Sequence, residues 1–193
     1  MSPRQIVAGI GFLVIVTTWS GGALIGQRWD SGGGAALAQR LADQPISFTG
    51  SLVDTPSLGS LQNRHAVYVP AYASIRLGSG KGKVDLASTL SIHNTSQQGA
   101  LVVIRADYFD TSGNLIHRYI AEPIAVRPLG TVEAFVPVED TRGGTGANFV
   151  VEWAAEGPLA EPIIEAVMMG SQGTQGYSFT SRGKHMRVIR SDP

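Results

Sequence analysis

The polar residues best placed for binding chemistry lie in the stretch DTRGGTGANFVVEW, residues 140–153. Asp140, Arg142 and Asn148 are grouped there around three glycines, and glycine allows a backbone to approach a ligand closely. A phosphate-binding loop would need a helix directly after the glycines, because free amides at a helix N-terminus bind the anion. Residues typical of a strand follow instead, and the GK[ST] ending of such a loop is absent. The stretch therefore predicts a turn leading into a strand, with Asp140, Arg142 and Asn148 as candidate ligand-binding residues.

A second candidate group lies in GSQGTQGYSFTSRG, residues 170–183. Gln172 and Gln175 offer adaptable amide groups beside the aromatic ring of Tyr177, a combination that suits a recognition loop. A long turn into a last strand is the alternative interpretation. We take Gln172 and Gln175 as further candidate ligand-binding residues.

Signals for catalysis and for metal binding are weak. The chain has no HExxH or GxSxG motif, and its histidines show no metal-ligand spacing. Residues 110–121 lack the Gly and Glu that a calcium loop needs at its sixth and twelfth positions, so they predict a hairpin turn with Gly113 in the left-handed conformation. Glutamates 152, 156, 161 and 165 are expected at solvated strand and turn positions. We expect no catalytic residue, no metal site and no cofactor.

Composition narrows the class of protein further. The net charge of zero argues against a nucleic-acid binder, since such proteins usually carry a basic excess. The absence of cysteine excludes a disulfide scaffold, a zinc ribbon and a thiol nucleophile.

The N-terminal segment Ile6–Ile25 has twenty residues without a charge, which is the length needed for a hydrophobic helix to cross a membrane. We expect a retained transmembrane anchor, because this apolar stretch is longer than the core of a typical signal peptide. Cleavage of a signal near Ala38, giving a secreted or periplasmic protein, is the alternative. In both cases the charge bias favours a domain in the periplasm or outside the cell.

The remaining sequence alternates between apolar and polar residues with the period of a strand. Pro70 and Pro137 are expected at strand ends or on edge strands, because proline cannot donate to a ladder. We predict an all-β fold, an immunoglobulin-like or fibronectin-like antiparallel β-sandwich of about eight strands. The predicted division is an anchor or signal at residues 1–28, a flexible linker at 29–65, the sandwich at 66–183 and a basic tail at 184–193. The expected inward-facing residues are listed by segment: Val84, Leu86, Ser88, Leu90 and Ile92; Val102, Ile104, Ala106 and Tyr108; Val132, Ala134, Val136 and Val138; Phe149, Val151 and Trp153.

Several segments together resemble one protein family. VYVPAY, LASTLSIHNT, DYFDTSGNLI, DTRGGTGANFVVEW and EPIIEAVMMGSQGTQGYSFTSRG, in this order, are similar to the bacterial domain of unknown function 3124 family over Tyr68–Gly183. The resemblance implies a bacterial protein that carries an N-terminal export signal or anchor. It implies no catalytic residues.

These observations favour a membrane-tethered or exported, non-enzymatic binding module that acts outside the cytoplasm on a protein or a cell-surface glycan. The first alternative is a small-ligand or ion-binding domain that uses the Asp140–Asn148 turn. The second alternative is a hydrolase with an unrecognised carboxylate or histidine site.

Overall fold

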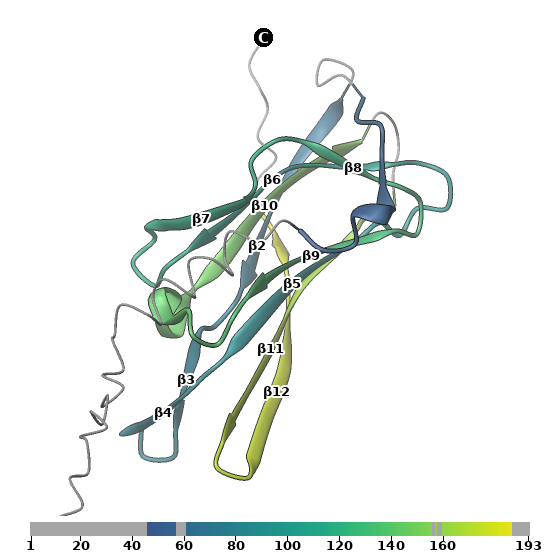
Figure 1. Ribbon diagram of the computed structural model, residues 1–193. Coiled ribbons are helices and arrows are strands. Elements are labelled where there is room, and N and C mark those ends of the chain that lie inside the picture. The colour runs from purple at the N-terminus through teal and green to yellow at the C-terminus, as the bar shows by residue number, and fades with distance from the viewer. Residues whose placement is uncertain (1–45, 57–60, 156, 158–159, 187–193) are drawn as a thin grey trace, which may run out of the picture. The chain divides into compact units, whose positions relative to one another are not determined.

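The computed structural model of the chain describes residues 46–56, 61–155, 157 and 160–186 (Figure 1). All of these residues belong to one compact unit, residues 31–193. The predicted membrane segment Ile6–Ile25 and the possible cleavage site near Ala38 lie outside them. Within the described part, no helix is long and apolar enough to span a membrane.

The described residues form thirteen antiparallel strands in three sheets. The largest sheet has the order β1 (Leu52–Val53), β8 (Ile124–Val126), β6 (Leu101–Phe109), β10 (Asn148–Ala155), β2 (Gln62–Pro70) and β13 (Lys184–His185), with β7 (Leu115–Ile120) also paired to β6. The second sheet has the order β12 (Gln175–Arg182), β11 (Ile163–Gln172), β5 (Ala87–His93) and β9 (Thr131–Val136). A hairpin of β3 (Ser74–Leu77) and β4 (Gly82–Asp85) forms the third, and two 3-10 segments, η1 (Thr49–Ser51) and η3 (Thr141–Gly146), complete the described elements.

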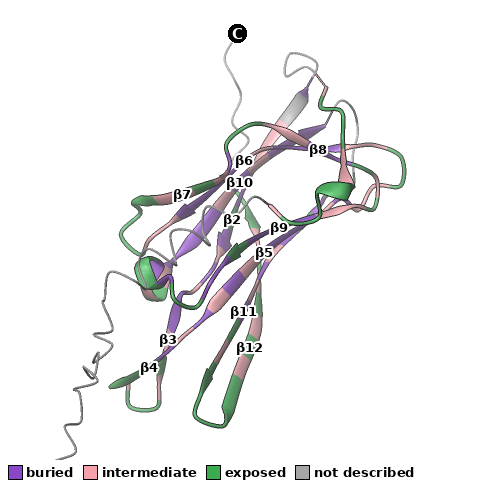
Figure 2. Ribbon diagram, in the orientation of Figure 1, coloured by how far each residue is buried: buried purple, intermediate pink, exposed green. Residues whose placement is uncertain are grey.

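The predicted all-β sandwich is therefore confirmed, and its immunoglobulin-like or fibronectin-like type stays a prediction. Buried residues run along the strands of both larger sheets (Figure 2) and form one main core. The prediction of about eight strands was too low. Strands of two residues, such as β1 and β13, are too short to show a period. Both lie outside the expected limits of the sandwich, residues 66–183. They nevertheless belong to it, since β1 pairs with β8 and β13 pairs with β2.

The inward face predicted for residues 84–92 is confirmed, since all five of its side chains are buried. However, the segment is not one strand. The backbone breaks at Leu86, so β4 pairs with β3 while β5 joins the four-stranded sheet. The amide of Leu86 donates to the carbonyl of Ala73 instead of continuing a ladder.

The face predicted for residues 102–108 is wrong in its first half. The main core contains Leu101 and Val103, together with Ala106 and Tyr108 as predicted. The cause is a bulge: Glu152 of β10 opposes Arg105, but the next residue, Trp153, opposes Val103. An extra residue in one strand reverses the alternation beyond it.

Proline ends strands where the sequence predicted it. Pro70 is the last residue of β2, and β9 ends directly before Pro137. Val138, expected in the core register of β9, is 39% exposed because the strand has ended before it.

The predicted hairpin at residues 110–114 is also confirmed. The Asp110 carboxylate accepts hydrogen bonds from the amides of Ser112 and Asn114 and from the Asn114 side chain. Gly113 has a φ of 82°, the left-handed conformation that this turn requires. These bonds lower the pKa of Asp110 below its ordinary value, with the Asn114 side-chain bond as the largest cause.

The two faces of the four-stranded sheet should respond differently to truncation. Leu90 of β5 is fully buried, whereas Phe135 of β9 is 47% exposed on the opposite face. We expect Leu90→Ala to lower the free energy of unfolding by about 2–5 kcal/mol, because it opens a cavity. Phe135→Ala should change it by about 0.5 kcal/mol or less. Urea denaturation followed by circular dichroism measures both, and equal losses would contradict the assigned faces.

Candidate functional site

The outer face of the four-stranded sheet carries large side chains that no described element covers. Strand register places Phe135, Thr89 and Val167 in one row across β9, β5 and β11. Ala87 and Met169 form the next row. Phe135 is 47% and Met169 61% exposed, so this face presents apolar surface to solvent.

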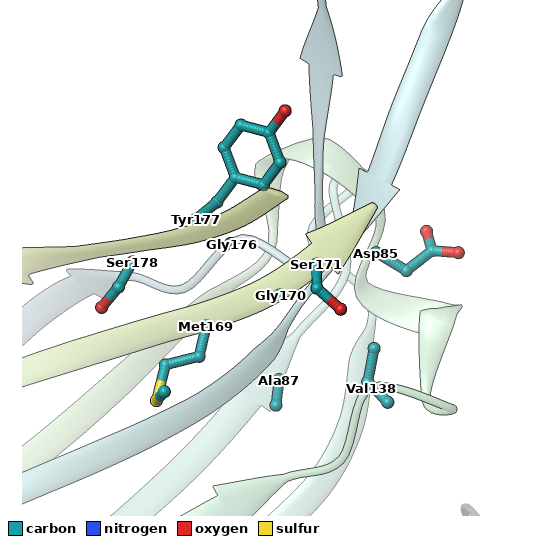
Figure 3. A pocket seen from close by; sticks show the side chains of 9 residues that line it. All are labelled: Asp85, Ala87, Val138, Met169, Gly170, Ser171, Gly176, Tyr177 and Ser178. Carbon is teal, nitrogen blue, oxygen red and sulfur yellow. The ribbon is translucent and has the colours of Figure 1, made fainter. Parts of the chain in front are cut away.

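An open groove of about 550 Å³ lies at one end of this face, beside the hairpin of β11 and β12 (Figure 3). Figure 3 shows the side chains of Met169 and Ser178 on one side of the hairpin and Tyr177 on the other. Its lining is mainly apolar or small, and its one charged residue is Asp85, which pairs with Lys83 at 2.9 Å. The lining residues are Asp85, Ala87, Val138, Met169, Gly170, Ser171, Gly176, Tyr177 and Ser178.

Gly170 determines how closely β11 packs at the groove. A Cβ atom there would lie 2.5 Å from the carbonyl oxygen of Asp85 and 2.7 Å from Cδ2 of Leu86. Only glycine therefore allows β11 to lie directly against the junction between β4 and β5. Gly170 is also one of the residues that line the groove.

A polar network occupies the other end of the outer face. The Ser91 hydroxyl lies 3.0 Å from Nε2 of His93 and donates to Glu133 at 3.4 Å. Nδ1 of His93 contacts the Thr131 hydroxyl at 2.9 Å. A catalytic triad has a carboxylate where Thr131 lies, so the arrangement differs from that of an activated serine. No sequence motif indicated this network, because Ser91 and His93 of β5 meet Thr131 and Glu133 of β9 only through the pairing of the two strands.

Asp140 and Arg142 form a brace within the glycine-rich turn. The Asp140 side chain is fully buried, and both of its oxygens accept from the Arg142 guanidinium, from Nε at 2.8 Å and from Nη2 at 2.7 Å. Asn148 is 8% exposed, and its amide group lies 3.5 Å from the carbonyl of Gly146. The predicted turn into a strand is confirmed, although part of it is the short 3-10 segment η3. Ligand binding by these residues stays a prediction.

The glycines of this turn allow close packing against the β6–β7 hairpin. A Cβ atom on Gly143 would lie 2.1 Å from the hydroxyl oxygen of the buried Tyr108. The Thr111 hydroxyl donates to the carbonyl of Gly143 and accepts from the amide of Gly146, both at 2.9 Å. Burial, and then the charge of Asp140, raise the pKa of Tyr108. The glycines thus have a packing function that explains their presence.

Gln172 and Gln175 lie on a different element, at the tip of the β11–β12 hairpin. They are paired across the two strands, both exposed, and the turn between them begins at Gly173 with a φ of 61°. Gln175 accepts a hydrogen bond from the Tyr177 hydroxyl at 3.0 Å. The structure therefore separates these two candidates from Asp140, Arg142 and Asn148, and places them one residue beyond the groove-lining Ser171 and Gly176.

A cluster of aromatic and titratable groups, not anticipated from the sequence, lies on β2, β10 and β13. The His65 ring stacks on the Trp153 indole with 4.3 Å between ring centroids, and His185 approaches His65 edge-on at 6.0 Å. Nε2 of His185 lies 2.5 Å from the Glu161 carboxylate. Burial, and secondarily the charge of His185, lower the pKa of His65, while the charge of Glu161 acts in the opposite direction.

The two antiparallel sheets around a shared core define an all-β sandwich domain with a groove on one outer face. The chain belongs to the family described as "Protein of unknown function (DUF3124)", whose model matches residues 64–186. The family resemblance of the sequence is thereby confirmed.

Comparison with curated proteins gave no match. Among solved structures, the chain is similar to one titled "Crystal Structure of Thermotoga maritima 1070", with 10% sequence identity and a TM-score of 0.36. The similarity covers 63% of this chain and 92% of the other.

Arg142→Met tests the Asp140 brace. This variant leaves a buried carboxylate without its partner, and we expect a loss of about 2–3 kcal/mol in the free energy of unfolding, because the partly exposed Arg142 reduces the 3–5 kcal/mol typical of a fully buried pair. The double variant Asp140→Asn with Arg142→Met should recover part of this loss. Chemical denaturation of both variants measures the difference, and an unchanged stability of Arg142→Met would contradict the brace.

His65 should make folding stability depend on pH. Its folded pKa lies below the ordinary 6.5, so the unfolded chain binds more protons in that range. Stability should therefore fall as the pH drops below about 6.5, until the pH has passed the folded pKa. His65→Phe keeps an aromatic ring beside Trp153 but cannot titrate, so its unfolding midpoint should vary less between pH 7.5 and 5.5. Equal pH dependence in both proteins would show that His65 is not the source.

Proposed function

We propose that the chain is an exported, membrane-tethered binding module whose recognition surface is the outer face of the four-stranded sheet. This outer face comprises the exposed side chains of Phe135, Met169 and Val138 and the groove beside them. Solvent-exposed apolar side chains next to a groove are typical of protein interaction sites. The groove, with Met169 at 61% exposure beside it, is the observation that carries the proposal.

The outer face of the seven-stranded sheet differs in its chemistry and strengthens this choice. Arg105 donates to Asp107 at 3.0 Å and to Glu152 at 2.7 Å, and Arg118 donates to the other oxygen of Asp107 at 2.9 Å. These four charged groups pair with one another across β6, β7 and β10. The centre of this outer face therefore carries charges that pair with one another, whereas the outer face of the four-stranded sheet carries the exposed side chains of Phe135 and Met169.

The lining of the groove favours a protein partner over a cell-surface glycan. Sugars are held by several hydrogen-bonding groups together with flat aromatic rings, whereas this groove offers Val138, Met169 and Ala87 with one aromatic residue, Tyr177. Apolar side chains of a protein partner match that lining. Both oxygens of Asp140 are occupied by Arg142, so the geometry favours the groove over the Asp140–Asn148 turn as the recognition site.

The tether is proposed from the sequence. Ile6–Ile25 is long and apolar enough for a membrane helix, and the weak charge bias orients the domain toward the periplasm or the exterior. An immunoglobulin-like or fibronectin-like sandwich is a fold class that serves binding at cell surfaces. Tether and exposed face together fit a protein that recognises a partner near the membrane.

Site-specific photocrosslinking in the native cell tests the recognition surface. Benzoylphenylalanine placed at Met169 or Val138 should capture the same protein, whereas the probe at Leu115, 49% exposed on the other sheet, should not capture it. Adding Phe135→Asp should remove most of the capture from Val138, because a charge would be buried in the complex without a partner. Equal capture from Leu115, or none from the outer face, would refute the proposal.

A further inference from the structure

In the described part of the protein, β12 presents a long open sheet edge that borders the groove. β12 is the end strand of its sheet and pairs with β11 over eight residues in continuous register. An unpaired edge presents a row of backbone donors and acceptors that can pair with another chain.

Four other edge strands of the two larger sheets are protected or short. β9, at the opposite end of the same sheet, is bridged by Ser47, whose amide donates to Glu133, and by the Tyr119 hydroxyl, which donates to the carbonyl of Phe135. β1 and β13 have two residues each, and β7 is interrupted by two register irregularities. Short strands and bulges are the usual means of blocking an edge, and β12, with eight residues in continuous register, has neither.

The ladder determines which groups of β12 are free. Gln172 and Gln175 close a two-residue turn, and the amide of Gly183 donates to the carbonyl of Ile164. The backbone groups of residues 175, 177, 179, 181 and 183 therefore form the hydrogen bonds to β11, because such bonds fall on alternate residues of an antiparallel strand. The backbone groups of Gly176, Ser178, Thr180 and Arg182 point to the open edge, and all four residues are exposed.

We propose that β12 binds an extended segment of a partner protein as an additional antiparallel strand, with a large apolar residue opposite Gly176 and an acidic residue opposite Arg182. This inference rests on the proposed function and names the form of the partner. Gly176 lines the groove, and a Cβ atom there would have no neighbour within 4 Å, so a side chain from the added strand can extend over it into the groove. Arg182 is 83% exposed, and its contact to Glu165 is long, at 3.9 Å, which leaves it available to an acidic residue.

A second copy of β12 fits this edge less well than a different segment does. Antiparallel pairing of two β12 strands would place a Gly, Ser, Thr or Arg opposite Gly176, because these are the residues that share its edge and face. None of them is a large apolar residue that could fill the groove. The chemistry of the groove therefore favours a partner segment over self-association.

The test uses the purified full chain and a fluorescent synthetic peptide of Thr and Val, with Phe placed six positions after Asp to match the separation of Arg182 and Gly176. Fluorescence anisotropy should show saturable binding. A peptide with Ala in place of Phe should bind about tenfold more weakly, as expected for the loss of a buried apolar group. Absence of binding, or equal binding of both peptides, would overturn the proposal.

Two pairs of variants separate backbone pairing from side-chain contacts. Ser178→Pro removes a donor at the open edge, leaves the ladder to β11 intact, and should weaken binding about tenfold, whereas Ser178→Thr should not. A larger side chain has room at position 176, so the Gly176→Val variant should fold. The valine side chain would cover the groove and should abolish the preference for the Phe peptide over the Ala peptide. Unchanged binding by Ser178→Pro, or a self-association of the chain that this variant abolishes, would overturn the proposal.

Amide exchange measured by NMR provides a readout that does not depend on the folding of Ser178→Pro. Bound peptide should slow exchange at Ser178 and Thr180, and unchanged exchange there contradicts strand addition. The photocrosslink from Met169 distinguishes the two proposals in the cell. If Ser178→Pro retains the full crosslink yield, the recognition surface stands and the strand addition fails.

Discussion

The contact of Gly170 with the chain at Leu86 is the constraint on which the arrangement of this sandwich depends. Leu86 is fully buried, its amide bonds to Ala73, and at this residue the chain leaves the small hairpin for the four-stranded sheet. The backbone of β11 passes directly over this point because Gly170 has no side chain. One close packing thus connects the β3–β4 hairpin with the four-stranded sheet, and the groove lies beside it.

The alternation of apolar residues predicted the faces of strands more reliably than it predicted their limits. Residues 84–92 have five buried side chains at every second position, as expected, yet two strands in two sheets share them. The alternation of side chains between the two faces depends only on an extended backbone. It therefore continues across a break between two strands when the chain is extended again after the break. Which sheet a strand joins depends on long-range hydrogen bonds, which have no local signature. The bulge opposite Trp153 shows the same limit, because an extra residue is visible only in the pairing.

The candidate site could be predicted only in part. Glycines and a strand-forming run predicted the turn at residues 140–148, and proline predicted the end of β9. Five of the nine groove-lining residues lie in the stretch 170–183, which the sequence indicated as a possible recognition loop. The other four, Asp85, Ala87, Val138 and Met169, lie outside that stretch and meet it only in the folded sheet. The stacked pair of His65 and Trp153 depends likewise on the pairing of β2 with β10, and the contact of His185 with Glu161 joins residues 24 positions apart. Spacing rules for histidine ligands and carboxylate pairs apply within one element and miss groups that meet across elements.

The outer face and the open edge of the four-stranded sheet supply two physically different kinds of recognition. Backbone groups along β12 bind any extended chain, since every residue except proline has the same donor and acceptor. They contribute affinity with little selectivity. The groove at Gly176 and the charge of Arg182 respond to side chains, so they discriminate between segments that the edge alone would accept. Each alone is weak as a recognition device, because an edge without a selective contact invites aggregation and a shallow groove without backbone bonds holds a ligand poorly. Their position on the same strand allows one extended segment to engage both.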